Sequence, residues 1–197
     1  AAAGDACAGR VGEAPIDFGG ALASMKYLIA AFVFLQATGL ANASSAAQAP
    51  TAEVHGAIGP FEALSQLVGT WKPVGETDSP LRIKFYLTAR GTVLVESWEV
   101  RGRPHSLTIY HRDGPGLIAT HYCPQGNQPR LFASGNTERR LHFTFRDATD
   151  LDPATESYQH ELWFDLSNPA RPIRGEIYRS DKGPGSPEET ALVRVDE

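Results

Sequence analysis

Apolar side chains alternate with polar ones along most of the chain after residue 80, and this period of two limits the structures that the chain can form. Leu81, Ile83 and Phe85 alternate with Arg82 and Lys84. A helix has a period of 3.6, so such segments predict β-strands with one buried face. Turn residues separate the segments, which predict about nine short strands. These segments are 81–87, 92–100, 106–112, 117–123, 130–133, 141–146, 158–166, 173–179 and 191–195.

A short helix and a tryptophan motif precede the strands. Apolar residues at helical spacing after Pro60 predict a helix over 60–68. Many short antiparallel strands pack as a sandwich or close into a barrel. The helix leads into Val68-Gly69-Thr70-Trp71, which resembles the opening of lipocalin-like (calycin) barrels, where the tryptophan plugs the closed end. The predicted fold class is therefore all-β, an antiparallel lipocalin-like barrel of about 8–10 strands with a short N-terminal helix.

Residues 25–43 have the three parts of a secretory signal peptide. Lys26 supplies a positive charge, residues 27–35 form a short apolar run, and Ala41-Asn42-Ala43 is a small-x-small cleavage site. The alternative is a buried N-terminal helix. We expect an exported protein, periplasmic or extracellular, that is cleaved near Ala43 and has no integral membrane segment in its mature part.

The rest of the chain is assigned by composition. Residues 1–24, which precede the only methionine, are interpreted as an upstream appendage, and residues 44–58, rich in Ala, Ser and Gln, as a flexible leader. Residues 59–197 form the predicted barrel domain. The net charge of -5 is spread along the chain, so nothing indicates nucleic-acid binding.

Cys123 is the only cysteine of the predicted mature part, because Cys7 lies upstream. No intramolecular disulfide is then expected, and a small buried thiol is the ordinary interpretation. A disulfide-linked homo-oligomer is the alternative.

Polar residues interrupt the regular pattern in one tract, Thr120-His121-Tyr122-Cys123 followed by Gly126-Asn127-Gln128-Pro129-Arg130. A three-residue hairpin loop at 113–115 would place His105 opposite Cys123. The predicted interior face of this hairpin is then His105, Leu107, Ile109, His111, Leu117, Ala119, His121 and Cys123. Tyr110 and Tyr122 are predicted to face outward.

Two further polar residues join the tract as candidates. His160 alternates with Tyr158, Leu162 and Phe164, so it is predicted to point inward. Glu96 shares a face with Leu94, Trp98 and Val100, although the loop that follows does not fix whether that face is interior.

The wider pattern resembles a group of exported bacterial proteins of unassigned activity with a lipocalin-like barrel. The resemblance covers residues 61–195 and rests on the Gly69-Thr70-Trp71 motif, Glu96, Tyr110-His111, the polar tract and His160. It implies a fold and a site position but no chemistry. The chain departs from the group in the acidic loop at 147–156 and in Glu161, which follows His160 where a methionine is expected.

The preferred functional interpretation is that the protein binds a small apolar or amphipathic molecule in the mouth of the barrel, because closed barrels of this size hold one small ligand. The predicted walls are Phe85, Trp98, Phe132, Phe143, Phe145, Trp163 and Phe164. The predicted polar binding residues are Glu96, His105, His121, Cys123, Asn127, Gln128, Arg130 and His160. No cofactor, metal ligand or catalytic residue is assigned.

Other interpretations use the same residues. One alternative is that the polar cluster is only a structural hydrogen-bond network. A thiol hydrolase would use Cys123 as nucleophile and His105 or His121 as base, although no hydrolase signature surrounds the cysteine. Two imidazoles and a thiolate would also suit zinc or copper, and a single histidine would suit haem. An interaction module tethered by residues 44–58 is a third class.

Overall fold

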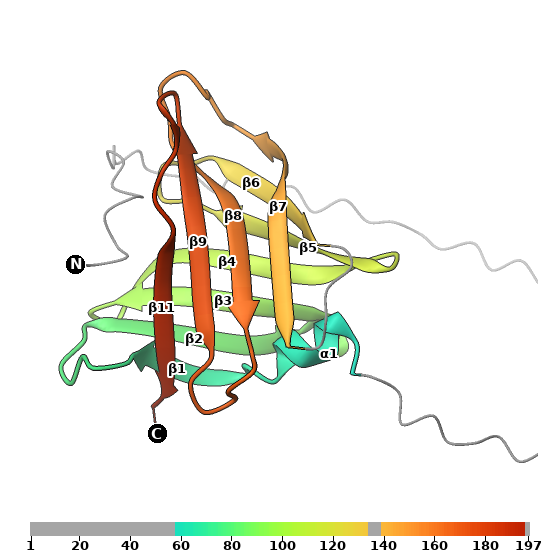
Figure 1. Cartoon of the computed structure of the whole chain (residues 1–197), viewed down its shortest axis with the longest axis vertical. Helices are drawn as coiled ribbons and strands as arrows, with labels where there is room; N and C mark the ends of the chain where they lie inside the picture. The colour runs from blue at the N-terminus through green and yellow to red at the C-terminus, as the bar shows by residue number, and fades with distance from the viewer. Residues whose placement is uncertain (1–57, 134–138, 196–197) are drawn as a thin grey trace, which may run out of the picture. The chain divides into compact units, whose positions relative to one another are not determined.

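The computed structural model describes residues 58–133 and 139–195 and forms a closed antiparallel β-barrel (Figure 1). The strand order is β10-β9-β11-β1-β2-β3-β4-β5-β6-β7-β8, and β9 also pairs with β8. That pairing closes a ring of 10 strands, which β10 joins only through β9. The predicted all-β, lipocalin-like barrel is confirmed. The predicted appendage and signal peptide, and the leader up to residue 57, lie outside the described residues.

The helix and most of the strands lie close to their predicted positions. The elements are α1 (Pro60–Ser65), β1 (Gly69–Pro73), β2 (Leu81–Thr88), η1 (Ala89–Gly91), β3 (Val93–Val100), β4 (Arg103–Asp113), β5 (Gly116–Tyr122), β6 (Gln128–Ala133), β7 (Arg140–Thr149), β8 (Tyr158–Asp165), β9 (Ile173–Ser180), β10 (Gly183–Pro184) and β11 (Glu188–Arg194). The strands β1 and β10 were not predicted: Gly69-Thr70-Trp71 was interpreted only as the motif that ends the helix, and β10 has only two residues.

The helix α1 and the tryptophan motif close one end of the barrel. Phe61 and Leu67 are buried, and the indole Nε1 of Trp71 donates a hydrogen bond to the Leu67 carbonyl at 2.6 Å. The guanidinium of Arg194 lies over the Trp71 ring, with its Cζ 4.4 Å from the ring centre. Gly69 has a φ of 135°, and a Cβ there would lie 2.1 Å from Arg194 Nη1, so this approach requires glycine.

Aromatic side chains fill the interior next to this closed end. Phe85, Tyr110, Phe143 and Phe164 are at most 2% exposed. The Phe164 ring lies edge-on to Phe85 at 6.3 Å and to Tyr110 at 6.0 Å, and Tyr110 lies 5.7 Å from Phe143. These rings come from β2, β4, β7 and β8, so they tie together walls that are distant in the sequence.

The predicted register of the β4–β5 hairpin was wrong by one residue on β4. Asp113 pairs with Gly116, which leaves a two-residue loop with Gly114 at a φ of 57°. A type II′ turn takes glycine at this position, and Pro115 fits the next one. Thr108 therefore opposes His121, and Tyr110 opposes Ala119.

This shift exchanges the two faces of β4 and leaves those of β5 as predicted. The residues Leu107, Ile109 and His111 share the outer face, while Tyr110, predicted to face outward, is fully buried inside. His121 and Cys123 are buried, and Tyr122 is 42% exposed, as the β5 pattern predicted.

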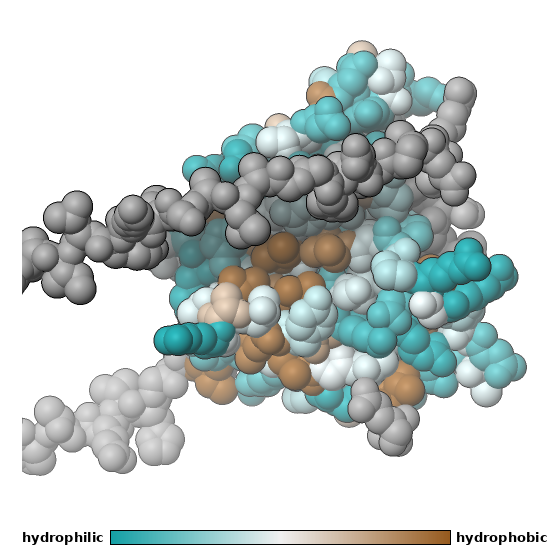
Figure 2. Space-filling view, turned by 180° about the vertical axis from the view of Figure 1, so that it is seen from behind, coloured by the Kyte–Doolittle hydropathy of each residue, from teal (hydrophilic) through white to brown (hydrophobic). Residues whose placement is uncertain are grey.

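The outer face of the barrel also carries apolar side chains. Val95, Ile109 and Ile118 face outward by register, and hydrophobic residues gather in the middle of the face formed by β2 to β5 when the molecule is seen from behind (Figure 2). Two residues of the predicted inner walls also belong to the outer face. Phe132 pairs with Ile118, and Trp163 pairs with Gly175.

We predict that Gly175→Ala lowers the free energy of unfolding by about 1–3 kcal/mol. A Cβ at this position would lie 2.0 Å from Cε2 of the Trp163 indole, which packs flat over the glycine. Urea unfolding followed by tryptophan fluorescence measures the change. Gly59→Ala is the matched control, since its Cβ would meet only the flexible carboxylate of Glu62. Equal stability of Gly175→Ala and the parent would contradict this packing.

Candidate functional site: a buried ion-pair network beneath an open pocket

Glu96 on β3 is fully buried and is the centre of a polar layer inside the barrel. Its Oε1 accepts hydrogen bonds from Trp98 Nε1 at 2.5 Å and from Arg174 Nε at 2.6 Å. Its Oε2 accepts a hydrogen bond from the Tyr110 hydroxyl. A buried carboxylate needs such partners to offset the loss of hydration, and here three donors surround it.

Arg174 on β9 extends this network across the barrel to a second carboxylate. Its side chain is 3% exposed, and its Nη1 lies 3.0 Å from Glu176 Oε2. Gln159 Nε2 donates to the same Glu176 oxygen at 2.7 Å. The Arg174 guanidinium also lies over the Trp98 ring, with Cζ 4.8 Å from the ring centre. One arginine thus joins two buried glutamates on facing walls.

The charges of this network favour one protonation state. Burial by itself would raise the pKa of Glu176, but Arg174, the hydrogen bond from Gln159 and nearby His121 outweigh it and lower that pKa. Burial would lower the pKa of Arg174, and the carboxylates of Glu176 and Glu96 instead hold it above its ordinary value. Burial, followed by the charge of Glu96, raises the pKa of Tyr110 well above its ordinary value. The carboxylate of Glu176 is therefore ionised, and the phenol of Tyr110 is neutral.

His121 links the polar layer to the open end of the barrel. Its Nδ1 lies 2.9 Å from Thr108 Oγ1, and its Nε2 lies 3.2 Å from the hydroxyl of Tyr178. The two rings meet edge-on with centres 6.5 Å apart. His121 is 3% exposed, so its visible role is to hold Tyr178 in place from behind.

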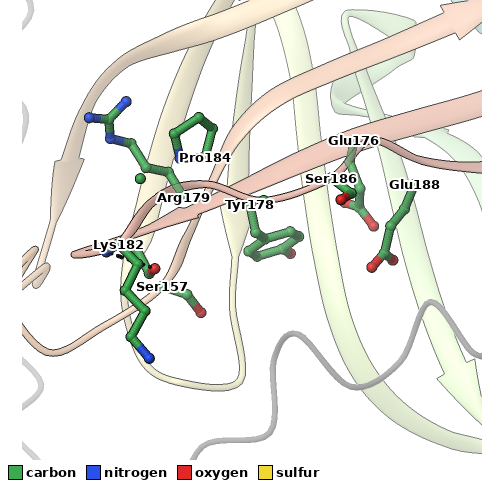
Figure 3. Close-up of a pocket in the computed structure, with 11 residues that line it drawn as sticks. Ser157, Glu176, Tyr178, Arg179, Lys182, Pro184, Ser186 and Glu188 are labelled. Atoms are coloured by element: carbon green, nitrogen blue, oxygen red, sulfur yellow. Dashed lines mark hydrogen bonds between the residues drawn. The ribbon is translucent and has the colours of Figure 1, made fainter.

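A pocket of about 490 Å³ lies at the end of β9 that points away from α1 (Figure 1), and Figure 3 shows the residues that line it. Glu176 and Tyr178 alternate along β9 and reach it from the interior face. Its other lining residues come from the start of β8, the β9–β10 hairpin and the start of β11. They are Ser157, Arg179, Ser180, Lys182, Gly183, Pro184, Gly185, Ser186 and Glu188.

The charged side chains of this pocket are segregated. In Figure 3, Glu176 and Glu188 lie at one end together with Ser186, Lys182 lies at the other end, and the Tyr178 ring lies between them. Glu176 is 7% exposed, so its carboxylate belongs both to the buried network and to the pocket wall. A ligand in this pocket would therefore contact a group whose charge and position are fixed from below.

A second hollow of about 510 Å³ lies on the outer wall, lined by residues that include His142, Trp163 and Ile177. Trp163 Nε1 donates to Glu189 Oε1 at 3.0 Å, and His142 Nε2 lies 2.8 Å from Glu161 Oε2. Both carboxylates belong to exposed or half-exposed residues. This hollow has no buried ionised group in its wall, so it is the weaker candidate.

Asn127, Gln128 and Arg130 of the polar tract form hydrogen bonds and an ion pair with neighbouring segments. Asn127 is fully buried, and its Nδ2 donates at 3.1 Å both to the Ser157 carbonyl and to Glu156 Oε2. Gln128 Oε1 accepts from Thr149 Oγ1 at 2.6 Å on the surface. Arg130 forms an exposed ion pair with Asp147 at 2.5 Å. The Asn127 contacts hold the segment before β6 against the segment before β8, behind Ser157 of the pocket wall, and the other two contacts join β6 to β7. None of the three residues lines the pocket itself.

The predicted cluster of His105, His121 and Cys123 does not form. Trp98 pairs with Ser106 and Glu99 with Pro104, so His105 is the extra residue of a β-bulge at the start of β4. Cys123 is 7% exposed, and Gln125 Nε2 lies 3.9 Å from its sulfur. The misassigned hairpin loop caused this error.

His160 is also the extra residue of a bulge, because Gln159 pairs with Tyr178 and Glu161 with Ile177. Its ring centre lies 6.0 Å from those of Phe145 and Tyr158. The bulge breaks the alternation on which the inward prediction for His160 depended. Gln159 faces the interior and is fully buried, while His160 is half-buried and its Nδ1 is buried without a hydrogen-bond partner among the described residues.

Sequence reasoning missed the residues that make the site, namely Gln159, Arg174, Glu176, Tyr178 and Glu188. One signal was available: Arg174 and Glu176 alternate on a strand that is flanked by Ile173 and Ile177. Ionisable residues at alternate positions of such a strand usually face solvent, and only the closed ring shows that Leu162 and Phe164 share their face.

Neither of two comparisons with known proteins adds an identity. No protein-family model matches the chain, and no curated protein matches its sequence. In the described part of the chain, no three His, Cys, Asp or Glu side chains gather closely enough to hold a metal ion. Among the same residues, no helix has the length and apolar character that a membrane span requires. The geometry of the barrel therefore carries the functional argument.

We predict that Glu96→Gln lowers the free energy of unfolding by about 3–5 kcal/mol, because it removes one charge from a buried ion pair. The exposed pair of Arg130 and Asp147 provides the control, and Asp147→Asn should cost less than about 1 kcal/mol. Urea unfolding of both variants at neutral pH measures the difference. Similar small losses in the two variants would show that the buried pair does not hold the walls together.

The lowered pKa of Glu176 predicts that the free energy of unfolding falls at acid pH, which gives the plot of stability against pH an acid limb. Its folded pKa lies below the ordinary value of 4.5, so its contribution is present above that value and is lost as the pH falls through the folded pKa. Unfolding at a series of pH values should show stability falling below about pH 4.5. Glu176→Gln should be less stable at neutral pH and lose less on acidification. Asp165, whose pKa is lowered by Ser167, contributes to the same limb in both proteins. Parallel acid limbs would contradict the assignment.

Proposed function

We propose that this protein is an exported binding protein that holds one small amphipathic molecule in the pocket at the open end of the barrel. The observation that carries the proposal is the position of Glu176, an ionised and almost fully buried carboxylate that forms part of the pocket wall. A pocket with a few fixed polar groups and a perturbed ionisable residue is the ordinary form of a ligand site.

The buried network holds this carboxylate in one position and in its ionised state. Arg174 and Gln159 hold Glu176 from below, and His121 holds the Tyr178 hydroxyl. Binding groups that are fixed before the ligand arrives lose little entropy on binding. The apolar part of the ligand would extend from Tyr178 toward Pro184, since aromatic side chains already occupy the interior near α1.

Export and family membership are part of the proposal and rest on the sequence. The signal-peptide pattern of residues 25–43 supports export, and cleavage would give a mature chain that begins at Ser44. The barrel, together with the Gly69-Thr70-Trp71 motif at its closed end, supports a place among lipocalin-like proteins. N-terminal sequencing of the exported protein tests the cleavage site.

Native mass spectrometry of the protein purified from its exported fraction tests the binding function. We predict a co-purifying organic molecule of roughly 100–300 Da, a size that suits a pocket of this volume. Tyr178→Ala should lose it, because this change removes the ring at the centre of the pocket. Tyr122→Ala is the matched control, as Tyr122 is 42% exposed on the outer face. Retention by Tyr178→Ala, or loss from both variants, would contradict the site.

A further inference from the structure

Two carboxylates face each other across neighbouring strands in the pocket wall. Glu176 on β9 and Glu188 on β11 are direct partners in the antiparallel register. Directly opposed residues have Cβ atoms about 4.5–5.5 Å apart, and like charges at this distance destabilise a sheet. Both residues line the pocket, and Figure 3 shows their side chains at the same end of it.

Within the described residues, Arg174 forms an ion pair with Glu176, and Glu188 has no ion-pair partner. The two contacts of the Glu176 carboxylate, from Arg174 and Gln159, are both to Oε2. Its Oε1 has no hydrogen-bond partner among residues 58–133 and 139–195, and neither does the Glu188 carboxylate. Arg174 is shared with Glu96, so the three residues of the network carry two negative charges and one positive charge. His121 adds a positive charge only when it is protonated.

A buried acceptor beside the pair has no donor either. Gln159 donates its amide Nε2 to Glu176, and its Oε1 is buried without a hydrogen-bond partner. Gln159 opposes Tyr178 in the register, so it shares the interior face with the two residues that reach the pocket. Buried polar atoms without partners are rare, and here the missing groups are donors. The Tyr178 ring next to the carboxylates offers a face that attracts cations.

We infer that the polar end of the ligand is an organic ammonium group, bound between Glu176 and Glu188 against the ring of Tyr178. This inference rests on the proposed binding function and names the class of ligand. An alkylammonium group supplies a positive charge and N–H donors for Glu176 Oε1 and the Glu188 carboxylate, which line the pocket, whereas Gln159 lies behind this wall. A metal ion fits less well, because no third His, Cys, Asp or Glu ligand lies close by among the described residues.

Three probes of equal chain length separate the possibilities: hexylammonium, hexanol and hexanoate. Isothermal titration calorimetry with the full chain should show hexylammonium binding at least about tenfold more tightly than hexanol, since a charge-assisted hydrogen bond contributes about that factor. Hexanoate should bind more weakly than hexanol. Tighter binding of hexanol or hexanoate than of hexylammonium would overturn the inference and leave the binding function standing. No binding of any probe, together with no co-purifying molecule, would overturn both.

Two variants with opposite charge changes test where the ammonium group binds in the pocket. Glu188→Gln should weaken hexylammonium binding about tenfold and raise the urea midpoint of unfolding, because it removes a repulsive neighbour of Glu176. Lys182→Gln, at the other end of the pocket, should leave ammonium binding unchanged or strengthen it. A Glu188→Gln variant that binds hexylammonium as the parent does would overturn the assignment. Since Glu188 is exposed, this variant is expected to fold.

Discussion

The ion pair between Glu96 and Arg174 is the interaction on which the rest of the interior depends. It joins β3 to β9, which lie 78 residues apart in the chain and on facing walls of the ring. Two buried charges lose their hydration in such a place, so each must be surrounded by partners. Tyr110 and Trp98 serve Glu96, while Glu176 serves Arg174. These hydrogen bonds and ion pairs therefore connect one wall of the barrel to the facing wall.

The interior of the barrel therefore has two parts, an aromatic part near α1 and a polar part at the other end. On the side of α1, the Phe85 and Phe164 rings pack against each other, and the indole of Trp71 needs only the Leu67 carbonyl as a polar partner. On the other side, the chain of partners ends at Glu176, whose second oxygen is left for the pocket. The ionised state of Glu176 and the position of Tyr178 follow from groups beneath them that no ligand touches. The structural network and the proposed binding site, which the sequence presented as alternatives, can therefore be two layers of one arrangement.

The fold could be predicted because it depends on patterns that repeat. Alternation over residues 81–87 or 141–146 reports a strand without knowledge of its neighbours, and enough short strands indicate closure. The Gly69-Thr70-Trp71 motif was informative for a local reason, since Trp71 needs the Leu67 carbonyl and Arg194 needs the space that Gly69 leaves. Such interactions involve few residues, and their spacing is visible in the chain.

The site could not be predicted to the same extent, because it depends on register. The loop after Asp113 is one residue shorter than predicted. Tyr110 therefore faces the core rather than the surface, and His105 lies outside the expected cluster. Bulges at His105 and His160 reversed the local alternation, and no residue type announces a bulge of this kind. The pairing of Glu176 with Glu188 joins β9 to β11 and becomes visible only when the sheet is assembled.

We propose that the buried network positions a binding site at the open end of the barrel. A high-resolution crystal structure of the protein, purified without denaturation, is the first measurement to make. The account predicts electron density for a small molecule against the Tyr178 ring, with a donor atom at hydrogen-bond distance from Glu176 Oε1. Density for a ligand on the outer wall beside Trp163, with only water between Glu176 and Glu188, would contradict it.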